Sequence, residues 1–233
     1  MDTQYDIVTL ATVSSTQDEA RTRFAETGKT LLIVSSEQVA GRGRQGRQWA
    51  QPDRGMYASL AFNPEWDLAD RTLIPLVAAV AMRRAIVTHL NTGIGLKWPN
   101  DILVGDLKVG GILVEASGDT VVVGCGLNLW WGDPMQGAAS LLDTDPGPEA
   151  ATVLGETIAD TWAQSLLVLH EVGPSDWPRA EYEDASVTLG EDVHWDAGSG
   201  RAVGIAVDGA LVVRSDGEHV ELHSGEVHTH RGR

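Results

Sequence analysis

The segment Gly41–Arg47 concentrates glycine and arginine in a pattern that suits the binding of a small anion. Its three glycines let backbone N–H groups turn toward one ligand, and its three arginines offer forked donors for a carboxylate or a phosphate. Two isolated lysines follow this segment. Lys97 and Lys108 are the only positive side chains between Ala85 and Pro178. Taken alone, such side chains are more often solvated surface. Together they indicate a pocket for a small anion.

The overall charge argues against two classes of partner. The 233 residues include 33 Asp and Glu against 17 Lys and Arg, which gives a formal net charge of −16. Such a field repels phosphate backbones and anionic lipid surfaces, so we expect no nucleic-acid partner and no membrane partner. The longest apolar run, Leu73–Met82, is also too short to cross a bilayer.

Cysteine usage and the first residues indicate the compartment. A single cysteine, Cys125, makes no internal disulfide, which fits a reducing environment. The stretch Met1–Gln4 is acidic and polar, whereas a secretory signal begins with positive charge and an apolar core. We therefore expect a cytoplasmic protein.

Two nucleotide-binding motifs match by spacing and fail by context. Gly41–Gly46 has the G-x-G-x-x-G spacing, but Pro52 and the absence of an apolar helical period after it exclude the helix that such a motif requires. Gly28-Lys29-Thr30 resembles the end of a P-loop, yet Arg23 stands where its first glycine belongs and a strand follows. The long loop Gln38–Gly55 is therefore expected to bind an anion in another way.

The elements around this loop predict an α+β fold, and after Ser186 the pattern changes to short strands with glycine-containing turns, typical of a small β-barrel. A Gly105-Asp106 hairpin turn precedes the strand that begins at Leu107. A Thr16-x-x-Glu19 capping box predicts the first helix. The predicted strands are Asp6–Val13, Thr30–Ser35, Met56–Phe62, Leu96–Trp98, Asp101–Val104, Leu107–Ala116 and Thr120–Gly126, and the predicted helices are Thr16–Gly28, Leu73–Leu90, Thr152–Glu171 and a short one at Trp177–Glu183.

An ordered set of motifs resembles the biotin protein ligase family, and the resemblance spans nearly the whole chain. Each motif alone is moderately specific, whereas the order and spacing of the set are highly specific. The motifs are Ser15-Thr16, Gly41–Arg47 with Trp49, Lys97-Trp98-Pro99-Asn100-Asp101, Lys108–Glu115 and Gly124–Asn128.

The resemblance implies the fold and the domain organisation. It implies a mixed β-sheet with helices packed on one side, as in a class II synthetase-like catalytic domain, over residues 1–185. A small SH3-like β-barrel is expected over residues 186–233. The first strand begins at Asp6, so we expect the monofunctional form of the family, without a DNA-binding domain. A monomer and a homodimer both stay open.

The resemblance also implies an ATP-dependent, AMP-forming ligase. The carboxylate of biotin attacks the α-phosphate of ATP, which yields biotinyl-5′-AMP and pyrophosphate, and a lysine of a biotin carboxyl carrier domain then takes the biotin. Bringing two anions together costs several kcal/mol unless cations bridge them. Lys108, Arg42 and Mg²⁺ are the expected bridges, with Lys108 and Arg42 as catalytic residues.

The same resemblance assigns the other site residues. It places the biotin site at Ser15, Thr16, Gln38, Gly41, Arg42, Lys108 and Gly111. It places the ATP site at Arg44, Arg47, Trp49, Asn100, Asp101, Lys108 and Asn128, with Asp101 as a metal ligand and Trp98 in the core. Thr16 would then serve both the cap and the biotin ring, which one residue does not easily do.

Departures and alternatives complete the expectations. Gln17 stands where the family usually has Asn, and His230 with Arg231 replaces an arginine that often contacts the nucleotide, so that contact stays unassigned. A lipoate-type ligase of the same superfamily and a non-catalytic biotin- or nucleotide-binding module are the alternatives. Retention of Lys108 and Arg42 favours an enzyme. An RNA-binding role for the Arg-Gly loop is disfavoured by the net charge.

Overall fold

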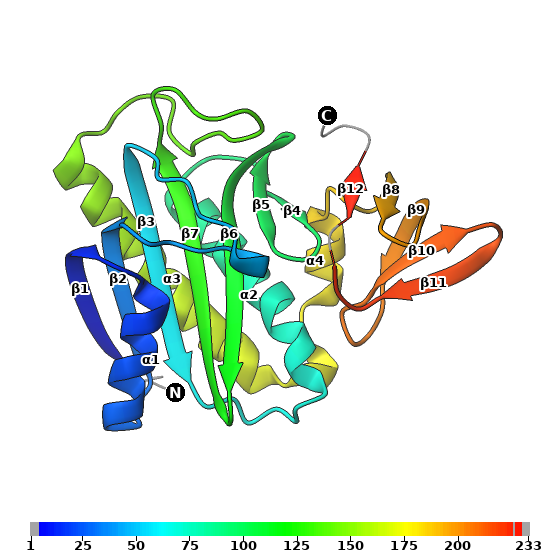
Figure 1. Ribbon diagram of the computed structural model, residues 1–233, viewed down its shortest axis with the longest axis horizontal. Helices are drawn as coiled ribbons and strands as arrows, with labels where there is room; N and C mark the ends of the chain where they lie inside the picture. Colours follow the sequence, from blue (N-terminus) through cyan, green and yellow to red (C-terminus); the bar gives the residue numbers. More distant parts are fainter. Residues whose placement is uncertain (1–4, 226, 230–233) are drawn as a thin grey trace.

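A seven-stranded mixed sheet forms the larger part of the computed structural model, which describes residues 5–225 and 227–229 (Figure 1). β1 and β2 run parallel, and every other neighbouring pair is antiparallel. The strand order is β1 (Asp6–Val13), β2 (Leu31–Gln38), β3 (Arg54–Phe62), β7 (Thr120–Trp130), β6 (Leu107–Ser117), β5 (Asp101–Val104) and β4 (Gly95–Lys97).

Helices cover both faces of this sheet, so the expectation of helices on one side is wrong. On one face, Phe24 of α1 (Thr16–Thr27) packs against Leu31 and Ile33 of β2. On the other, Leu32 and its neighbours join the main core with α2 (Ile74–His89) and α3 (Pro148–Val172). The physical reason lies in β2, since successive side chains of a strand point to opposite faces and this strand is apolar at both.

One helical segment is longer than the apolar run expected from the sequence. The segment Asp70–His89 has 20 residues and is long and apolar enough to span a membrane by length and composition alone. Most of its apolar stretch is buried between the sheet and α3, and a core helix of a globular protein is often equally long and apolar. It begins as a 3₁₀ turn (Asp70–Leu73) and continues as α2.

The C-terminal unit is a separate five-stranded antiparallel sheet, consistent with the expected SH3-like barrel. It follows a 3₁₀ turn (Pro174–Asp176) and α4 (Arg179–Ala185), and Trp98 joins it to the larger unit by donating Nε1–H to the Gly209 carbonyl at 3.0 Å. Trp98 is 3% exposed and belongs to the core, as expected. The strand order is β11 (Glu218–Leu222), β10 (Leu211–Ser215), β9 (Gly198–Ile205), β8 (Asp192–Trp195) and β12 (His228–Thr229). A domain boundary after residue 185 stays a prediction.

Candidate functional site

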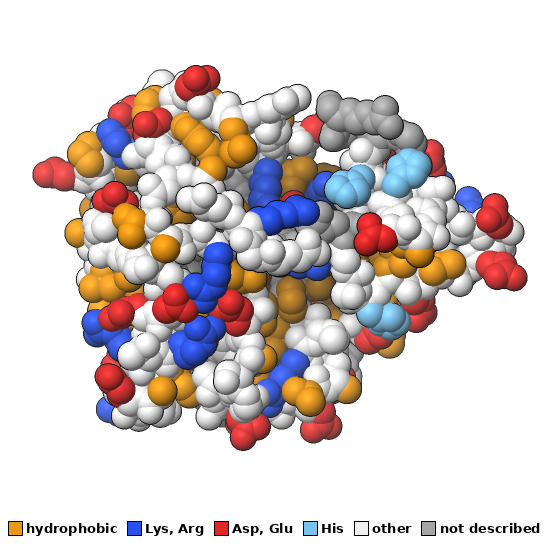
Figure 2. Space-filling view, in the orientation of Figure 1, with side chains coloured by type: hydrophobic (Ala, Val, Ile, Leu, Met, Phe, Trp, Pro, Cys, Tyr) orange, Lys and Arg blue, Asp and Glu red, His pale blue; other side chains and the backbone are white. Residues whose placement is uncertain are grey.

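The predicted motifs meet around one cavity of about 310 Å³, which opens between the larger unit and the C-terminal unit (Figure 2). Lysine and arginine side chains lie at its mouth. Most predicted site residues line it, whereas Gly41 and Asn128 lie outside the lining. The predicted residues that line it are Ser15, Thr16, Gln38, Arg42, Arg44, Arg47, Trp49, Asn100, Asp101, Lys108 and Gly111.

One wall of the cavity is uncharged and buried; we call Ser15, Thr16, Gln17, Gln38 and Ser59 the neutral wall. All five are between 0% and 8% exposed. The Thr16 N–H and hydroxyl both donate to Gln38 Oε1, at 2.7 and 3.0 Å, and the Ser59 hydroxyl donates to Thr16 Oγ1 at 2.8 Å. This wall is therefore fixed by folding before any ligand arrives.

Ser15, not Thr16, caps α1, so the predicted capping box is displaced by one residue. Ser15 has extended backbone angles, and its Oγ accepts from the Asp18 N–H at 3.4 Å. Thr16 is the first helical residue and its hydroxyl is directed to Gln38 instead. The shift resolves the conflict between the two roles expected of Thr16.

Gln17 is a polar wall residue that sequence reasoning treated only as a departure from the family. Its Nε2 donates to Glu115 Oε2 at 3.1 Å and weakly to the Val122 carbonyl at 3.4 Å. Its Oε1 is buried without a hydrogen-bond partner while the side chain lines the cavity. A Cβ at residue 124 would lie 2.7 Å from that oxygen, so Gly124 makes room for the amide. A buried orphan acceptor facing a cavity is suited to an N–H donor of a ligand.

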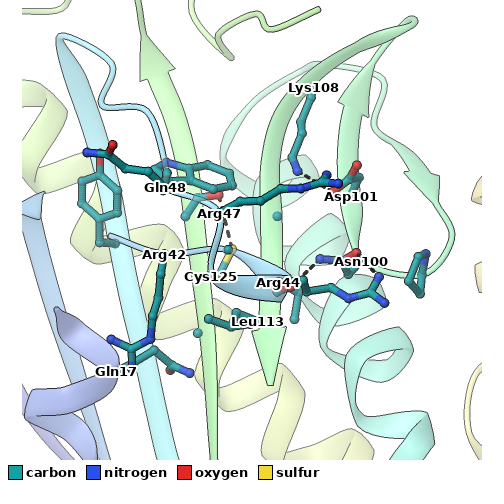
Figure 3. A pocket seen from close by; sticks show the side chains of 18 of the residues that line it. Gln17, Arg42, Arg44, Arg47, Gln48, Asn100, Asp101, Lys108, Leu113 and Cys125 are labelled. Carbon is teal, nitrogen blue, oxygen red and sulfur yellow. Dashed lines mark hydrogen bonds and ion pairs between the residues drawn. The ribbon is translucent and has the colours of Figure 1, made fainter. Parts of the chain in front are cut away.

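The opposite wall carries charge; we call Lys97, Lys108, Arg44, Arg47 and Asp101 the cationic wall. Lys108 Nζ lies 2.5 Å from Asp101 Oδ1 and 5.3 Å from the centroid of the Trp49 ring. Arg44 donates to Asn100 Oδ1 at 3.1 Å (Figure 3). It also donates to the Gly225 carbonyl at 3.0 Å, so it spans from the larger unit to the C-terminal unit. Lys108 and Asp101 side chains are 38% and 25% exposed, so solvent and a ligand both reach them.

A β-bulge in β6 aims Lys108 into the cavity. Leu103 of β5 pairs with Lys108 while Ile102 pairs with Gly110, which leaves Val109 as an extra residue in β6. Val109 is fully buried in the core, and Lys108 on one side of it and Gly111 on the other both line the cavity. If the same residues paired without a bulge, strict alternation from Gly111 would point Lys108 toward the core.

A loop after β7 holds the backbone of Lys108. The Lys108 N–H donates to the Gly137 carbonyl and its carbonyl accepts from the Ala139 N–H, both at 2.9 Å. Asn128 fixes this loop, because its Nδ2 donates to the Ala139 carbonyl at 2.9 Å and its carbonyl accepts from the Leu141 N–H. Asn128 Oδ1 is buried without a partner. Asn128 thus acts on Lys108 through one backbone segment, a relation the motif order did not reveal.

Two glycines let the Trp49 ring lie flat beside Lys108. A Cβ at residue 111 would come 3.2 Å from Trp49 Cζ3, and one at residue 126 would come 3.1 Å from Trp49 Cε2. Both positions are therefore too close to the ring for a side chain to fit without moving it. The ring forms a half-buried aromatic surface next to the ammonium group.

Arg42 extends away from Arg44, toward the α1 side of the cavity (Figure 3). Its guanidinium donates to both oxygens of Asp18, at 2.6 and 2.8 Å, and to both oxygens of Glu115, at 3.1 and 3.3 Å. The Arg42 guanidinium is the largest cause that lowers the pKa of the Asp18 carboxyl, and it also lowers the pKa of the Glu115 carboxyl against the opposing effect of burial. The bridging role expected of Arg42 stays a prediction.

The cavity floor is apolar and its cysteine is chemically quiet. Leu113 and Cys125 line the floor beside Gly124. Burial raises the pKa of the Cys125 thiol well above its usual range, so the thiol stays protonated and is no nucleophile. His228 also lines the cavity, whereas His230 and Arg231 lie outside the described residues.

Comparison with known proteins identifies the family. Residues 9–128 match the model of the biotin/lipoate A/B protein ligase family, and residues 188–228 match the biotin protein ligase C terminal domain. A biotin–[acetyl-CoA-carboxylase] ligase of Paracoccus denitrificans is 35% identical over 155 residues, which cover 64% of this chain and 62% of that protein. The chain thus spans less than two thirds of that relative's length.

Solved structures of biotin protein ligases superpose on nearly the whole chain. A biotin protein ligase from Aquifex aeolicus in complex with biotin and ATP superposes with a TM-score of 0.77 at 26% identity, covering 96% of this chain and 97% of the other. A biotin protein ligase from Leishmania major in complex with biotinyl-5-AMP gives a TM-score of 0.66 at 27% identity, covering 93% and 98%. The family model matches more than half of the residues of this chain, so the chain belongs to the biotin/lipoate A/B protein ligase family.

Proposed function

We propose that this chain is a biotin protein ligase, which joins biotin to ATP as biotinyl-5′-AMP and then transfers biotin to a lysine of a biotin carboxyl carrier domain. The observation that carries the proposal is the meeting of the neutral wall and the cationic wall in one cavity. A neutral ring with N–H and C=O groups suits the first wall, and a carboxylate beside a triphosphate suits the second.

In the first step, a carboxylate oxygen of biotin attacks the α-phosphorus, and the bond from that phosphorus to the β-phosphate oxygen breaks as pyrophosphate leaves. Two unit charges about 4 Å apart repel by about 4 kcal/mol at the effective dielectric of a protein surface. The Lys108 ammonium offsets this repulsion by donating to both anions, with Arg44 and Arg47 serving the phosphates. Asp101 holds Lys108 until the ligands arrive.

In the second step, the neutral amine of the acceptor lysine attacks the carbonyl carbon of the adenylate. The bond from that carbon to the phosphate oxygen breaks, AMP leaves and the amine loses a proton. Trp49 offers its ring to the adenine side, and Asn100 fixes Arg44 beside the phosphate. Ser15, Thr16, Gln38 and the backbone of Gly111 serve the biotin ring, whereas Gly41 lies outside the lining and contributes through the loop that it begins.

Mg²⁺ would enter with ATP. The described residues contain no group of three or more His, Cys, Asp or Glu that could hold a metal ion by themselves. One carboxylate, Asp101, lines the cavity, and Mg²⁺ commonly combines one or two carboxylates with substrate phosphates. Asp101 therefore fits an ion carried by the nucleotide, which would neutralise phosphate charge.

Biotin is favoured over lipoate by the match of residues 188–228 to the biotin protein ligase C terminal domain. The test is release of pyrophosphate from ATP and Mg²⁺ in the presence of biotin or of lipoate. Release with biotin, followed by label transfer to a carrier domain, is the expected result. Release with lipoate alone would transfer the proposal to a lipoate ligase, and silence of the folded protein with both acids would leave a binding module. The chain's location in the cytoplasm and its action as a monomer or a homodimer stay predictions.

A further inference from the structure

The loop Gly41–Gln48, which we call the arginine loop, has few backbone contacts of its own. Gly43 N–H donates to the Arg47 carbonyl at 2.7 Å, and Trp49 N–H donates to the Gly41 carbonyl at 3.0 Å. Gln45 and Gly46 both have positive φ, at 57° and 73°, so the loop tip is a tight turn. A loop of this kind needs side-chain contacts to lie in one place.

Arg42 and Arg44 supply such contacts at opposite sides of the cavity. The two side chains point away from each other (Figure 3). Arg44 reaches Asn100 and the C-terminal unit, and Arg42 reaches α1 and β6. The Arg42 side has the denser network. Arg42 also donates to the Ser15 hydroxyl at 3.3 Å, so the same guanidinium touches the neutral wall.

The charges on the Arg42 side balance locally. Two guanidinium groups meet two carboxylates, because Arg21 donates to Glu115 Oε2 at 2.6 Å and to Asp18 Oδ1 at 3.0 Å. Asp18 lies in the first turn of α1, where the helix dipole also favours a negative charge. A guanidinium bound to two carboxylates in this way has little net charge to offer an incoming phosphate.

We infer that Arg42, Asp18, Glu115 and Arg21 form an ion-pair latch that holds the arginine loop over the neutral wall, and that Arg42 is a positioning residue. The inference rests on the proposed function in one respect, namely that the covered ligand is biotin and its adenylate. The latch consists only of residues of this chain, so it is testable without any ligand. The charge that assists the reaction then comes from the cationic wall.

The first experiment measures loop opening without any ligand. Trypsin cleaves after Arg44 and Arg47 only when the loop leaves the surface, so the initial rate of these cuts, read by mass spectrometry, reports the open fraction. We expect Asp18→Asn and Arg42→Gln each to raise that rate about threefold to tenfold. The double variant should be cut no faster than Arg42→Gln alone, since Arg42→Gln already removes the contact between Arg42 and Asp18.

Glu19→Gln is the matched control. Glu19 lies in the same first turn of α1 and pairs with Arg23 at 2.7 Å. Glu19→Gln therefore removes one acidic charge and one ion pair from the same helix and leaves the contacts of the arginine loop in place. We expect its cleavage rate to stay within twofold of wild type. Equal rates for Asp18→Asn, Glu19→Gln and wild type would overturn the latch, as would additive effects in the double variant.

The second experiment separates a latch from a bridging cation. Asp18→Asn leaves the Arg42 charge in place, whereas Arg42→Gln removes it. A latch predicts that Asp18→Asn, which keeps the Arg42 charge, forms biotinyl-5′-AMP in a single turnover at a rate within about threefold of wild type, and that it loses the adenylate several times faster. A bridging role would instead slow formation about 100-fold in Arg42→Gln alone and would overturn the inference. If wild type forms no adenylate, the proposed function fails while the proteolysis still decides the latch.

Discussion

The two walls of the cavity are built on opposite principles. The neutral wall is at most 8% exposed, and three of its side chains, Thr16, Gln38 and Ser59, are already hydrogen-bonded to one another. The Lys108 and Asp101 side chains of the cationic wall are 38% and 25% exposed and face each other as a close ion pair. A neutral ring gains most from partners fixed in advance, because every unmatched buried polar atom costs about 1–3 kcal/mol. An anionic ligand gains most from a cation such as Lys108, which can leave its protein carboxylate, Asp101, and bind the ligand instead.

The largest effect that sharpens this comparison is expected at Lys108. Lys108→Ala removes the ammonium that we propose contacts both anions, so kcat for biotin-dependent pyrophosphate release should fall about 100- to 1,000-fold. The KM for biotin should change far less, because the neutral wall is untouched. Lys29→Ala, an exposed lysine, is the control. A loss expressed mainly in KM would show that the ammonium serves binding rather than reaction.

A change in the neutral wall should have the opposite signature. Thr16→Val keeps the shape but removes the hydroxyl between Gln38 and Ser59, so the free energy of unfolding should fall by about 1–3 kcal/mol. The KM for biotin should rise about tenfold while kcat changes little. Thr22→Val is the control, since that exposed hydroxyl bonds only within its own helix. Urea denaturation and steady-state kinetics measure the two quantities, and an unchanged KM would contradict the assignment.

A smaller effect is expected where the cationic wall depends on its support. Asn128→Ala releases the Ala139 carbonyl and loosens the segment that holds Lys108. We expect kcat for pyrophosphate release to fall about fivefold to twentyfold, and we expect no further fall when Lys108→Ala is already present. Asn63→Ala, at an exposed amide bonded to Thr120, is the control. Full additivity of the two changes would mean that Asn128 acts independently of Lys108.

The smallest effect is a pH dependence at the border of the neutral wall. The lowered pKa values of Asp18 and Glu115 mean that both carboxylates stabilise the folded chain above about pH 4, the range of unfolded carboxyl groups. This contribution disappears as the pH falls through their lower folded values.

The Asp18→Asn/Glu115→Gln double variant should therefore be less stable than wild type at pH 7, by about 1 kcal/mol for such half-exposed pairs. The difference should shrink toward pH 3. Thermal melting of both proteins between pH 3 and pH 7 measures it, with Glu19→Gln as the comparison. A difference that is constant with pH would assign the loss to packing instead of charge.

Much of the fold follows from the sequence because strand alternation and glycine turns are local signals. The Gly105-Asp106 hairpin and the burial of Trp98 illustrate this. The presence of α1 on its own face of the sheet did not follow, since which face a helix covers is decided by packing between distant segments. The cap at Ser15 was missed by one residue, because Ser and Thr both cap helices and only the contact with Gln38 distinguishes them.

In the site, too, local sequence signals predict some features, whereas others depend on contacts between distant segments. Motif resemblance brought together most of the residues that line the cavity, but it did not indicate that Arg42 faces two carboxylates or that Ala139 holds Lys108. These contacts join parts of the chain that are far apart, and charge or motif spacing alone does not predict them. Gln17 had a local signal, since an amide followed Ser15-Thr16, yet its orphan oxygen is visible only in three dimensions.

The bulge at Val109 gives β6 two phases. Beyond the bulge, the odd-numbered Gly111 and Leu113 line the cavity and Glu115 contacts Arg42, whereas Lys108 lines the cavity with an even number. The side of the sheet that each half of β6 faces therefore depends on the bulge. If the strand kept all its residues but paired without the bulge, the half that carries the ammonium would turn toward the core and the half that carries Glu115 would stay as it is. Removing one residue together with the bulge would instead leave both halves facing as they do now. A search for functional lysines by alternation alone would assign this one to the wrong side of the sheet.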